Sequence, residues 1–109
     1  MTIGVYTFEV HIADAQSLKQ KRQVLRRIKD RLRSRFNIAL IELNENHELW
    51  QRGGIAVVSI AERREPLERL FESIHEEAER FAPGSIMEQG ADFLEASDGG
   101  PGRWTGDWA

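Results

Sequence analysis

The sequence predicts an α+β domain in which two helices cover one face of a four-stranded antiparallel sheet. Two segments carry apolar residues at helical spacing, and four others carry the alternating or continuous apolar runs typical of strands. These segments follow one another in the order strand, helix, strand, strand, helix, strand. Each predicted helix has a single apolar stripe, so both helices must bury it against the same sheet. A chain of 109 residues provides one such domain.

The first predicted strand covers residues 3–12, where side chains alternate between two faces. One face consists of Tyr6, Phe8, Val10 and Ile12. The other face consists of Val5, Thr7, Glu9 and His11. This alternation predicts a strand that is buried on one side only.

The first predicted helix extends from Leu18 to Arg35 and contains no glycine or proline. Ser17 and Gln20 have the spacing of a capping box, in which the two side chains satisfy free backbone N–H groups at the helix start. The apolar stripe of this helix consists of Leu18, Leu25, Ile28, Leu32 and Phe36.

Two further strands are predicted in the middle of the chain, at residues 37–45 and 55–60. The second of these is a near-continuous apolar run that follows Gly53 and Gly54, as expected of a central strand. The connection between the two strands is polar and contains Trp50, whose ring we expect to anchor the loop over the core.

The second predicted helix begins near Pro66. Proline has no backbone N–H, and this costs nothing in the first turn of a helix, where an N–H would have no intrahelical partner. It should end before Pro83. Its apolar stripe consists of Leu67, Leu70, Phe71, Ile74, Ala78 and Phe81. A last strand is predicted at residues 86–94, with Gly90 marking a β-bulge.

The preference for right-handed crossovers then favours one topology, the split βαβ or ferredoxin-like arrangement βαββαβ. The predicted domain covers residues 1–95. Residues 96–109 are rich in glycine, have no periodicity and are predicted to form a flexible tail. Trp104 and Trp108 are unusual in a tail without function.

Composition excludes several classes of protein. The chain has no cysteine, so it forms no disulfide, thiolate metal site or cysteine nucleophile. No apolar run approaches the ~18–20 residues of a membrane span, and the N-terminus lacks the pattern of a signal peptide. We therefore expect a cytoplasmic protein with no membrane partner.

The first helix carries an unusual concentration of positive charge. Nine basic side chains and one acid between residues 17 and 35 give +8, which leaves −11 for the rest of a chain whose net charge is −3. In one interpretation, the acidic second helix neutralises the first. In the other, an external polyanion binds near the helix start, where free N–H groups and cations meet phosphate.

Lys21 favours the second interpretation, because it lies on the apolar stripe, where a purely structural design would place Leu or Ala. Snorkelling of its aliphatic stem is the structural alternative. The predicted phosphate-binding set is Lys19, Lys21, Arg22, Arg26, Lys29 and Arg33.

The sheet face opposite the helices is predicted to be open. The third strand offers no aromatic side chain for base stacking of the kind used by RNA-recognition motifs. An apolar patch on this face would instead pair with a second subunit. The predicted dimer face consists of Val5, Thr7, His11, Ile55 and Val57.

The three histidines give no clear catalytic or metal site. His11, His47 and His75 fall on a strand, a loop and a helix, and Glu72 with His75 has no second copy to complete a two-metal site. We predict no metal and no cofactor. Because His11 lies beside Glu9, a small hydrolase or transferase is a further hypothesis, ranked third after RNA binding and a dimeric scaffold.

Several short elements carry a family resemblance. They are Ser17-Leu18-Lys19, Lys21-Arg22, Lys29-Asp30-Arg31-Leu32-Arg33, Phe36-Asn37 and Leu49-Trp50-Gln51-Arg52. Over residues 2–95 the chain resembles the YlxP-like family of small bacterial proteins, a domain of unknown function with a ferredoxin-like fold. It departs from the family pattern at residues 60–62, where Ile-Ala-Glu replaces a short polar turn, and in its tail.

The resemblance implies a link to RNA or ribosomes, since the family's genes often neighbour those of translation-initiation and ribosome-binding factors. It implies no catalytic residue. Our leading hypothesis is therefore a non-enzymatic module that binds ribosomal or other structured RNA through its basic helix. The alternative is a dimeric scaffold that docks an acidic protein partner, with the tail tryptophans as anchors.

Overall fold

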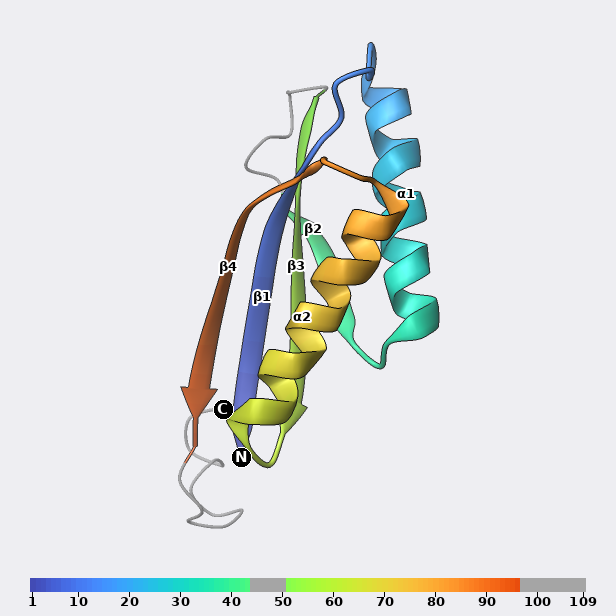
Figure 1. The fold of residues 1–109 in the computed structure, drawn as a ribbon. Coiled ribbons are helices and arrows are strands. Elements are labelled where there is room, and N and C mark those ends of the chain that lie inside the picture. Colours follow the sequence, from blue (N-terminus) through green and yellow to red (C-terminus); the bar gives the residue numbers. More distant parts are fainter. Residues whose placement is uncertain (44–50, 97–109) are drawn as a thin grey trace.

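A computed structural model describes residues 1–43 and 51–96 of the chain (Figure 1). The elements are β1 (Thr2–His11), α1 (Leu18–Arg35), β2 (Ala39–Leu43), β3 (Arg52–Ala61), α2 (Arg64–Phe81) and β4 (Ile86–Glu95). The predicted order βαββαβ is confirmed. The predictions for His47, Trp50 and the tail with Trp104 and Trp108 lie outside the described residues.

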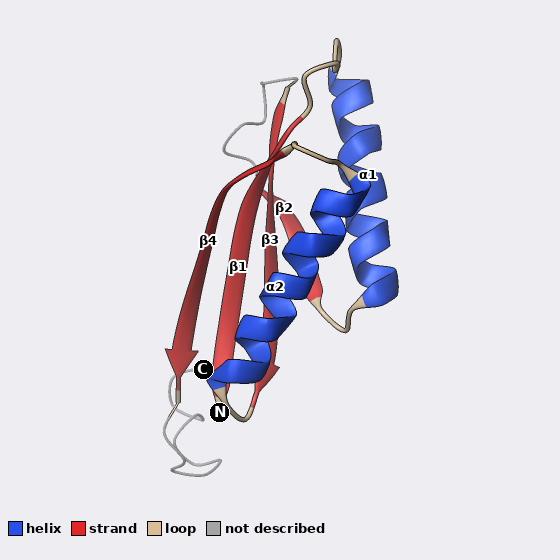
Figure 2. Ribbon diagram, viewed as in Figure 1, coloured by secondary structure: helices blue, strands red, loops and turns tan. Residues whose placement is uncertain are grey.

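The four strands form one antiparallel sheet in the order β2-β3-β1-β4. Both helices lie on the same face of this sheet, and the opposite face carries no helix of the described chain (Figure 2). Helix α1 packs over β2 and β3, whereas α2 packs over β1, β3 and β4. This is the predicted ferredoxin-like arrangement, and it places α1 and β4 at opposite sides of α2.

The core lies between the sheet and the two helices. From β1 it receives the predicted inward face, and from each helix it receives most of the predicted apolar stripe. The largest fully buried side chains are Phe8, Val10, Leu25, Leu32, Ile28, Ile55, Val57, Leu67 and Ile74. Because water is excluded from this layer, the apolar area that it removes from solvent stabilises the fold.

The start of α1 is capped nearly as predicted. Ser17 is the N-cap, and its Oγ accepts a hydrogen bond from the backbone N of Gln20 at 3.2 Å. The side chain of Gln20 reaches one residue further back than in a capping box, because its Oε1 accepts from the backbone N of Gln16 at 2.6 Å. The cap fixes where the basic helix begins.

The prediction for β3 was wrong about which residues face outward. Ile55 pairs with Phe8 and Val57 pairs with Tyr6, so all four side chains share the helix-covered face. Ile55 and Val57 are fully buried and do not belong to a dimer face. The open face of β3 is formed by the alternate residues, including Ala56, Val58 and Ile60.

The sequence predicted a β-bulge at Gly90. In the structure, the bulge is formed by Glu88 and Gln89, the two residues that precede Gly90. Thr7 pairs with Gly90 while Glu9 pairs with Met87, so two residues of β4 stand opposite one residue of β1. Glu88 has the positive φ of 48° in this bulge. This turns its carboxylate toward Arg52, whose Nη2 lies 3.5 Å from Glu88 Oε1.

Candidate nucleic-acid interface on the first helix

Helix α1 presents part of its positive charge to solvent along one side. Lys19, Arg22, Arg26 and Arg33 are all exposed. Their spacing of three, four and seven residues places them on one side of the helix. At a rise of ~1.5 Å per residue, the line is about 21 Å long. We call these four side chains the basic ridge.

The basic ridge is weakly neutralised by the rest of the domain. In residues 1–43 and 51–96, Lys19, Arg22 and Arg26 have no carboxylate within ion-pair distance. Arg33 has Asp30 at 3.8 Å, and both side chains are more than half exposed. An exposed pair of this kind contributes little, because water and salt screen it.

The other two members of the predicted phosphate-binding set, Lys29 and Lys21, do not belong to the basic ridge. Lys29 forms an ion pair with Glu42 on β2, with Nζ 3.2 Å from Oε2. Lys21 is only 4% exposed, so its inclusion in a surface phosphate site was wrong. Burial lowers the pKa of Lys21, and this effect is opposed by the charge of Glu42 and reinforced by that of Arg22. Its position on the apolar stripe therefore reflects packing.

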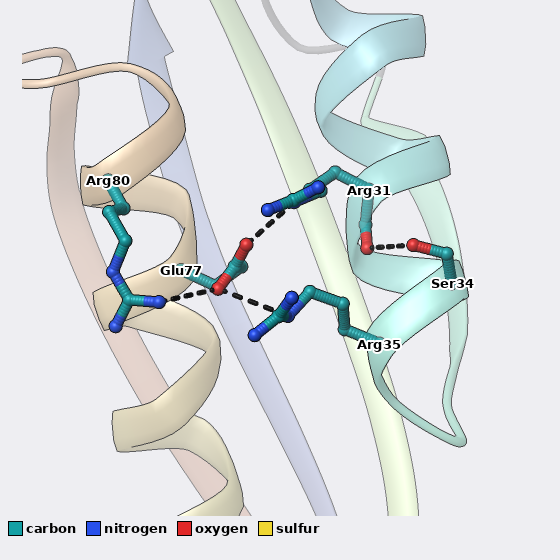
Figure 3. Close-up of polar contacts among 5 residues, drawn as sticks. All are labelled: Arg31, Ser34, Arg35, Glu77 and Arg80. Carbon is teal, nitrogen blue, oxygen red and sulfur yellow. Dashed lines mark hydrogen bonds and ion pairs between the residues drawn. The ribbon is translucent and has the colours of Figure 1, made fainter.

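The second helix neutralises a different part of α1 through one carboxylate (Figure 3). Glu77 on α2 accepts from Arg31 Nε at 2.7 Å and lies 3.3 Å from Arg35 Nε. Arg80, one turn along α2, donates from Nη1 at 3.1 Å to Glu77 Oε2, the oxygen that also faces Arg35. The side chain of Glu77 is only 4% exposed, whereas those of Arg31 and Arg35 are about half exposed and that of Arg80 is nearly two-thirds exposed.

These contacts hold the carboxylate of Glu77 in its charged form. The hydrogen bond from Arg31 lowers the pKa of Glu77 most, and the charges of Arg35, Arg31 and Arg80 add to it against the opposing effect of burial. Neither Arg31 nor Arg35 belongs to the basic ridge. The first interpretation, neutralisation by the second helix, therefore applies to the side of α1 that carries Arg31 and Arg35.

Sequence reasoning treated α2 as generally acidic and missed the special position of Glu77. A signal was present in the sequence, because Glu77 follows Ile74 by three residues and precedes Phe81 by four. That spacing places a carboxylate at the margin of the apolar stripe. A buried acid is stable only with a cationic partner, and the arginines of α1 supply it.

Glu9 and His11, the residues of the hydrolase hypothesis, lie on the open face of the sheet. Arg52 Nε donates to Glu9 Oε1, and the same guanidinium reaches Glu88. This hydrogen bond from Arg52 is the main cause of a lowered pKa for Glu9. A carboxylate held in this way is a weak general base, because it has less tendency to take up a proton.

The open face also carries exposed aliphatic side chains. Ile41 on β2, Ile60 on β3 and Leu94 on β4 are each about three-fifths exposed. Val5 and Thr7 lie on this face as predicted, and Val5 helps to line an apolar hollow of about 250 Å³ beside Ile41 and Val58.

In residues 1–43 and 51–96, no three His, Asp or Glu side chains are grouped to hold a metal ion. Neither described helix has an apolar stretch suited to crossing a membrane. His75 lies apart from both the basic ridge and the open face, in a cavity beside β4.

The fold is similar to those of two designed proteins. The de novo design LFR1 1, with a ferredoxin fold, superimposes with a TM-score of 0.51 at 11% identity, over 93% of this chain and 89% of the design. The design Foldit4 gives a TM-score of 0.50 at 14% identity, over 88% of this chain and 98% of the design. At such identities the similarity concerns the fold alone.

The sequence of the chain matches a natural protein and the model of a protein family. It is 33% identical to "Uncharacterized protein YlxP" of Bacillus subtilis (strain 168) over 72 residues, which are 66% of this chain and 77% of that protein. The family model described as "Protein of unknown function (DUF503)" matches residues 3–90. The chain therefore belongs to the DUF503 family, to which its YlxP-like elements pointed.

Proposed function

We propose that this protein binds the phosphate backbone of structured RNA, such as ribosomal RNA, through the basic ridge of α1. It acts as a non-enzymatic module in the cytoplasm. One observation carries the proposal: Glu77 pairs with Arg31 and Arg35, while Lys19, Arg22 and Arg26 pair with no described carboxylate. Four of the cations that the fold leaves exposed on α1 are thus ordered along one line, and Arg27 lies off this line.

The geometry of the ridge suits a polyanion. Four cations along about 21 Å of helix can each meet a phosphate, because nucleic-acid duplexes carry closely spaced charges along their axis. The remainder of the chain beyond residues 17–35 has a net charge of −11. Repulsion from this acidic remainder orients the protein, so that only the ridge side approaches the polyanion.

The test is binding to ribosomal RNA fragments and to ribosomes as a function of salt, with R22E/R26E as the variant. The matched control is R63E/R69E, which changes the net charge equally at two exposed arginines of the α2 region that form no described ion pair. Each phosphate contact contributes about −0.7 to −0.9 to the slope of log K against log salt. We expect a slope of roughly −3 for wild type and the control, and roughly −1.5 for R22E/R26E, which keeps two of the four contacts.

Three results would contradict the proposal. The first is the absence of binding at low salt. The second is equal weakening by R22E/R26E and R63E/R69E, which would assign the effect to net charge. The third is ridge-dependent capture of an acidic protein that survives nuclease treatment, which would favour the scaffold hypothesis.

The open sheet face favours a second, compatible property, the formation of a homodimer. Three strands of ten residues and one of five, at ~4.8 Å spacing and ~3.3 Å per residue, give a face of roughly 550 Å². Two copies face to face would bury roughly 1,100 Å², which is near the lower limit of about 1,200 Å² for specific interfaces. Exposed Ile41, Ile60 and Leu94 supply the apolar contacts, and a two-fold axis allows the same patch to serve both subunits.

Light scattering after size exclusion tests the dimer. We expect a mass of two chains for wild type and of one chain for Ile60→Lys. Phe81→Lys is the control, because Phe81 is also exposed but lies at the end of α2, away from the open face. A monomeric wild type at high micromolar concentration would refute the dimer without affecting the RNA proposal.

A further inference from the structure

A cavity of about 400 Å³ lies between α2 and β4, at the side of α2 opposite α1. Its volume falls within the range of small-molecule sites. The lining residues are Tyr6, Glu68, Phe71, Glu72, His75, Glu76, Gln89, Ala91 and Phe93. Among residues 1–43 and 51–96, the lining therefore combines three aromatic rings with three carboxylates and contains no lysine or arginine.

The aromatic part of the cavity is ordered. Tyr6 stacks on Phe71 with ring centroids 5.4 Å apart, and Phe71 packs against Phe93 at 5.8 Å. The Tyr6 hydroxyl donates to Gln89 Oε1 at 2.6 Å and lies 3.5 Å from His75 Nδ1. Burial, with a smaller effect from the charge of Glu79, raises the pKa of Tyr6 to about 12. The hydroxyl consequently keeps its proton at neutral pH, and the polar network stays intact.

The chain's own Arg64 shows what this lining attracts. Its guanidinium lies 4.3 Å from the centre of the Phe93 ring, and its Nε is 3.7 Å from Glu68 Oε1. A ring face and a carboxylate of the cavity wall thus already hold one planar cation. Further along α2, Glu72 and Glu76 repeat the carboxylate at intervals of four residues and form no ion pair with any described residue.

We propose that this cavity binds a small organic cation, a guanidinium, amidinium or primary amine with an apolar body. The apolar body would contact Phe71 and Phe93, and the cationic end would lie between Glu72 and Glu76. The aromatic faces attract the cation through their quadrupoles, and the carboxylates supply charge that the rings lack. The site is independent of the basic ridge on α1, since it takes ligands of opposite charge and lies between α2 and β4.

Benzamidine is the probe, and benzamide, which has nearly the same shape without the charge, is its control. The full chain is titrated at constant ionic strength, and binding is followed by NMR at the ring of Tyr6, the single tyrosine of the chain. We expect shifts of the Tyr6 and His75 ring signals with benzamidine and none with benzamide at the same concentration.

Variants locate the site. E72Q/E76Q should weaken benzamidine binding by about two- to fivefold for each lost carboxylate, the range given by exposed ion pairs. E62Q/E65Q changes the net charge equally at exposed residues that do not line the cavity, and should leave binding unchanged. Ala91→Leu should abolish binding by filling the cavity from β4.

The proposal is overturned if benzamide perturbs Tyr6 as strongly as benzamidine does, or if benzamidine does not bind. It is equally overturned if E72Q/E76Q binds like E62Q/E65Q, or if Ala91→Leu binds like wild type. Two further ligands identify the source of the cation. Tighter binding of agmatine indicates a free small molecule, and tighter binding of a capped Gly-Arg-Gly peptide indicates an arginine side chain.

Discussion

Arg31 on α1 donates a hydrogen bond from Nε to Oε1 of the buried Glu77 on α2, at 2.7 Å. This contact joins the two helices of the domain across 46 residues of sequence. It also determines which arginines of a strongly basic helix are held by the fold and which stay available at its surface. The same carboxylate pairs with Arg35, whereas the four members of the basic ridge do not contact it.

Glu77→Gln should destabilise the domain. The amide keeps the shape of the side chain but removes the negative charge that faces three guanidinium groups. We expect the melting temperature at neutral pH to fall by roughly 5–10 °C, measured by circular dichroism. Glu72→Gln on the same helix, which removes an exposed carboxylate without a described ion pair, should change it little. Equal melting temperatures for wild type and Glu77→Gln would show that the contact does not stabilise the helix pair.

The contribution of Glu77 should depend on pH in a defined direction. Its folded-state pKa lies below the ordinary 4.5, so folding favours the ionised carboxylate. Its stabilisation is complete above pH 4.5 and is lost as the pH falls through the folded-state pKa. Thermal melts of wild type and Glu77→Gln should therefore differ at pH 7 and converge below pH 4.5. A difference that stays constant with pH would assign the effect to shape and not to charge.

Adjacent residues of α1 should differ in RNA binding. Arg22 lies on the basic ridge, whereas Lys21 is buried. Arg22→Met should reduce the magnitude of the salt slope of binding by about 0.7–0.9, the contribution of one phosphate. Lys21→Met removes the same charge one position earlier and should leave the slope unchanged. The reverse order would place Lys21 at the phosphates after all and would remove the basis for the ridge.

The approach of α1 to the sheet depends on Gly53. A Cβ at this position of β3 would lie 2.6 Å from Leu25 Cδ1 and 3.2 Å from Leu25 Cγ, so the fully buried Leu25 side chain would have to shift within the core. Gly53→Ala should therefore cost about 1–3 kcal/mol in the free energy of unfolding, as overpacked cores do. Gly90→Ala on β4 is the control, because its Cβ would meet nothing closer than 3.6 Å. Denaturant titration of both variants measures the difference.

Local patterns in the sequence predicted most of the fold. The bounds of α1 agree with the predicted Leu18 to Arg35, because its stripe, its cap and its lack of glycine or proline are all local properties. The predicted ends of the strands agree less well with the structure. β3 begins at Arg52, three residues before the predicted start, because pairing with β1 extends it through Gly53 and Gly54.

The inward face of β3 is a case that local pattern leaves open. A continuous apolar run has two apolar faces, so a period of two cannot tell which one is buried. Pairing with β1 decides it, because Phe8 and Tyr6 already face the helices and bring Ile55 and Val57 with them. The dimer face was misassigned at these two residues for that reason.

By itself, the sequence determined the order of the elements, the apolar stripes and the concentration of positive charge on α1. Only the tertiary structure decided which basic side chains of α1 form ion pairs and which stay exposed, because a carboxylate on α2 can contact arginines of α1 only when the two helices lie side by side. Glu77 lies next to Arg31 and Arg35 and far from Arg22, and the energy of an ion pair depends on distance and burial. The same packing of α2 against β4 brought Tyr6, His75 and Gln89 together into a cavity, although 83 residues separate the first from the last.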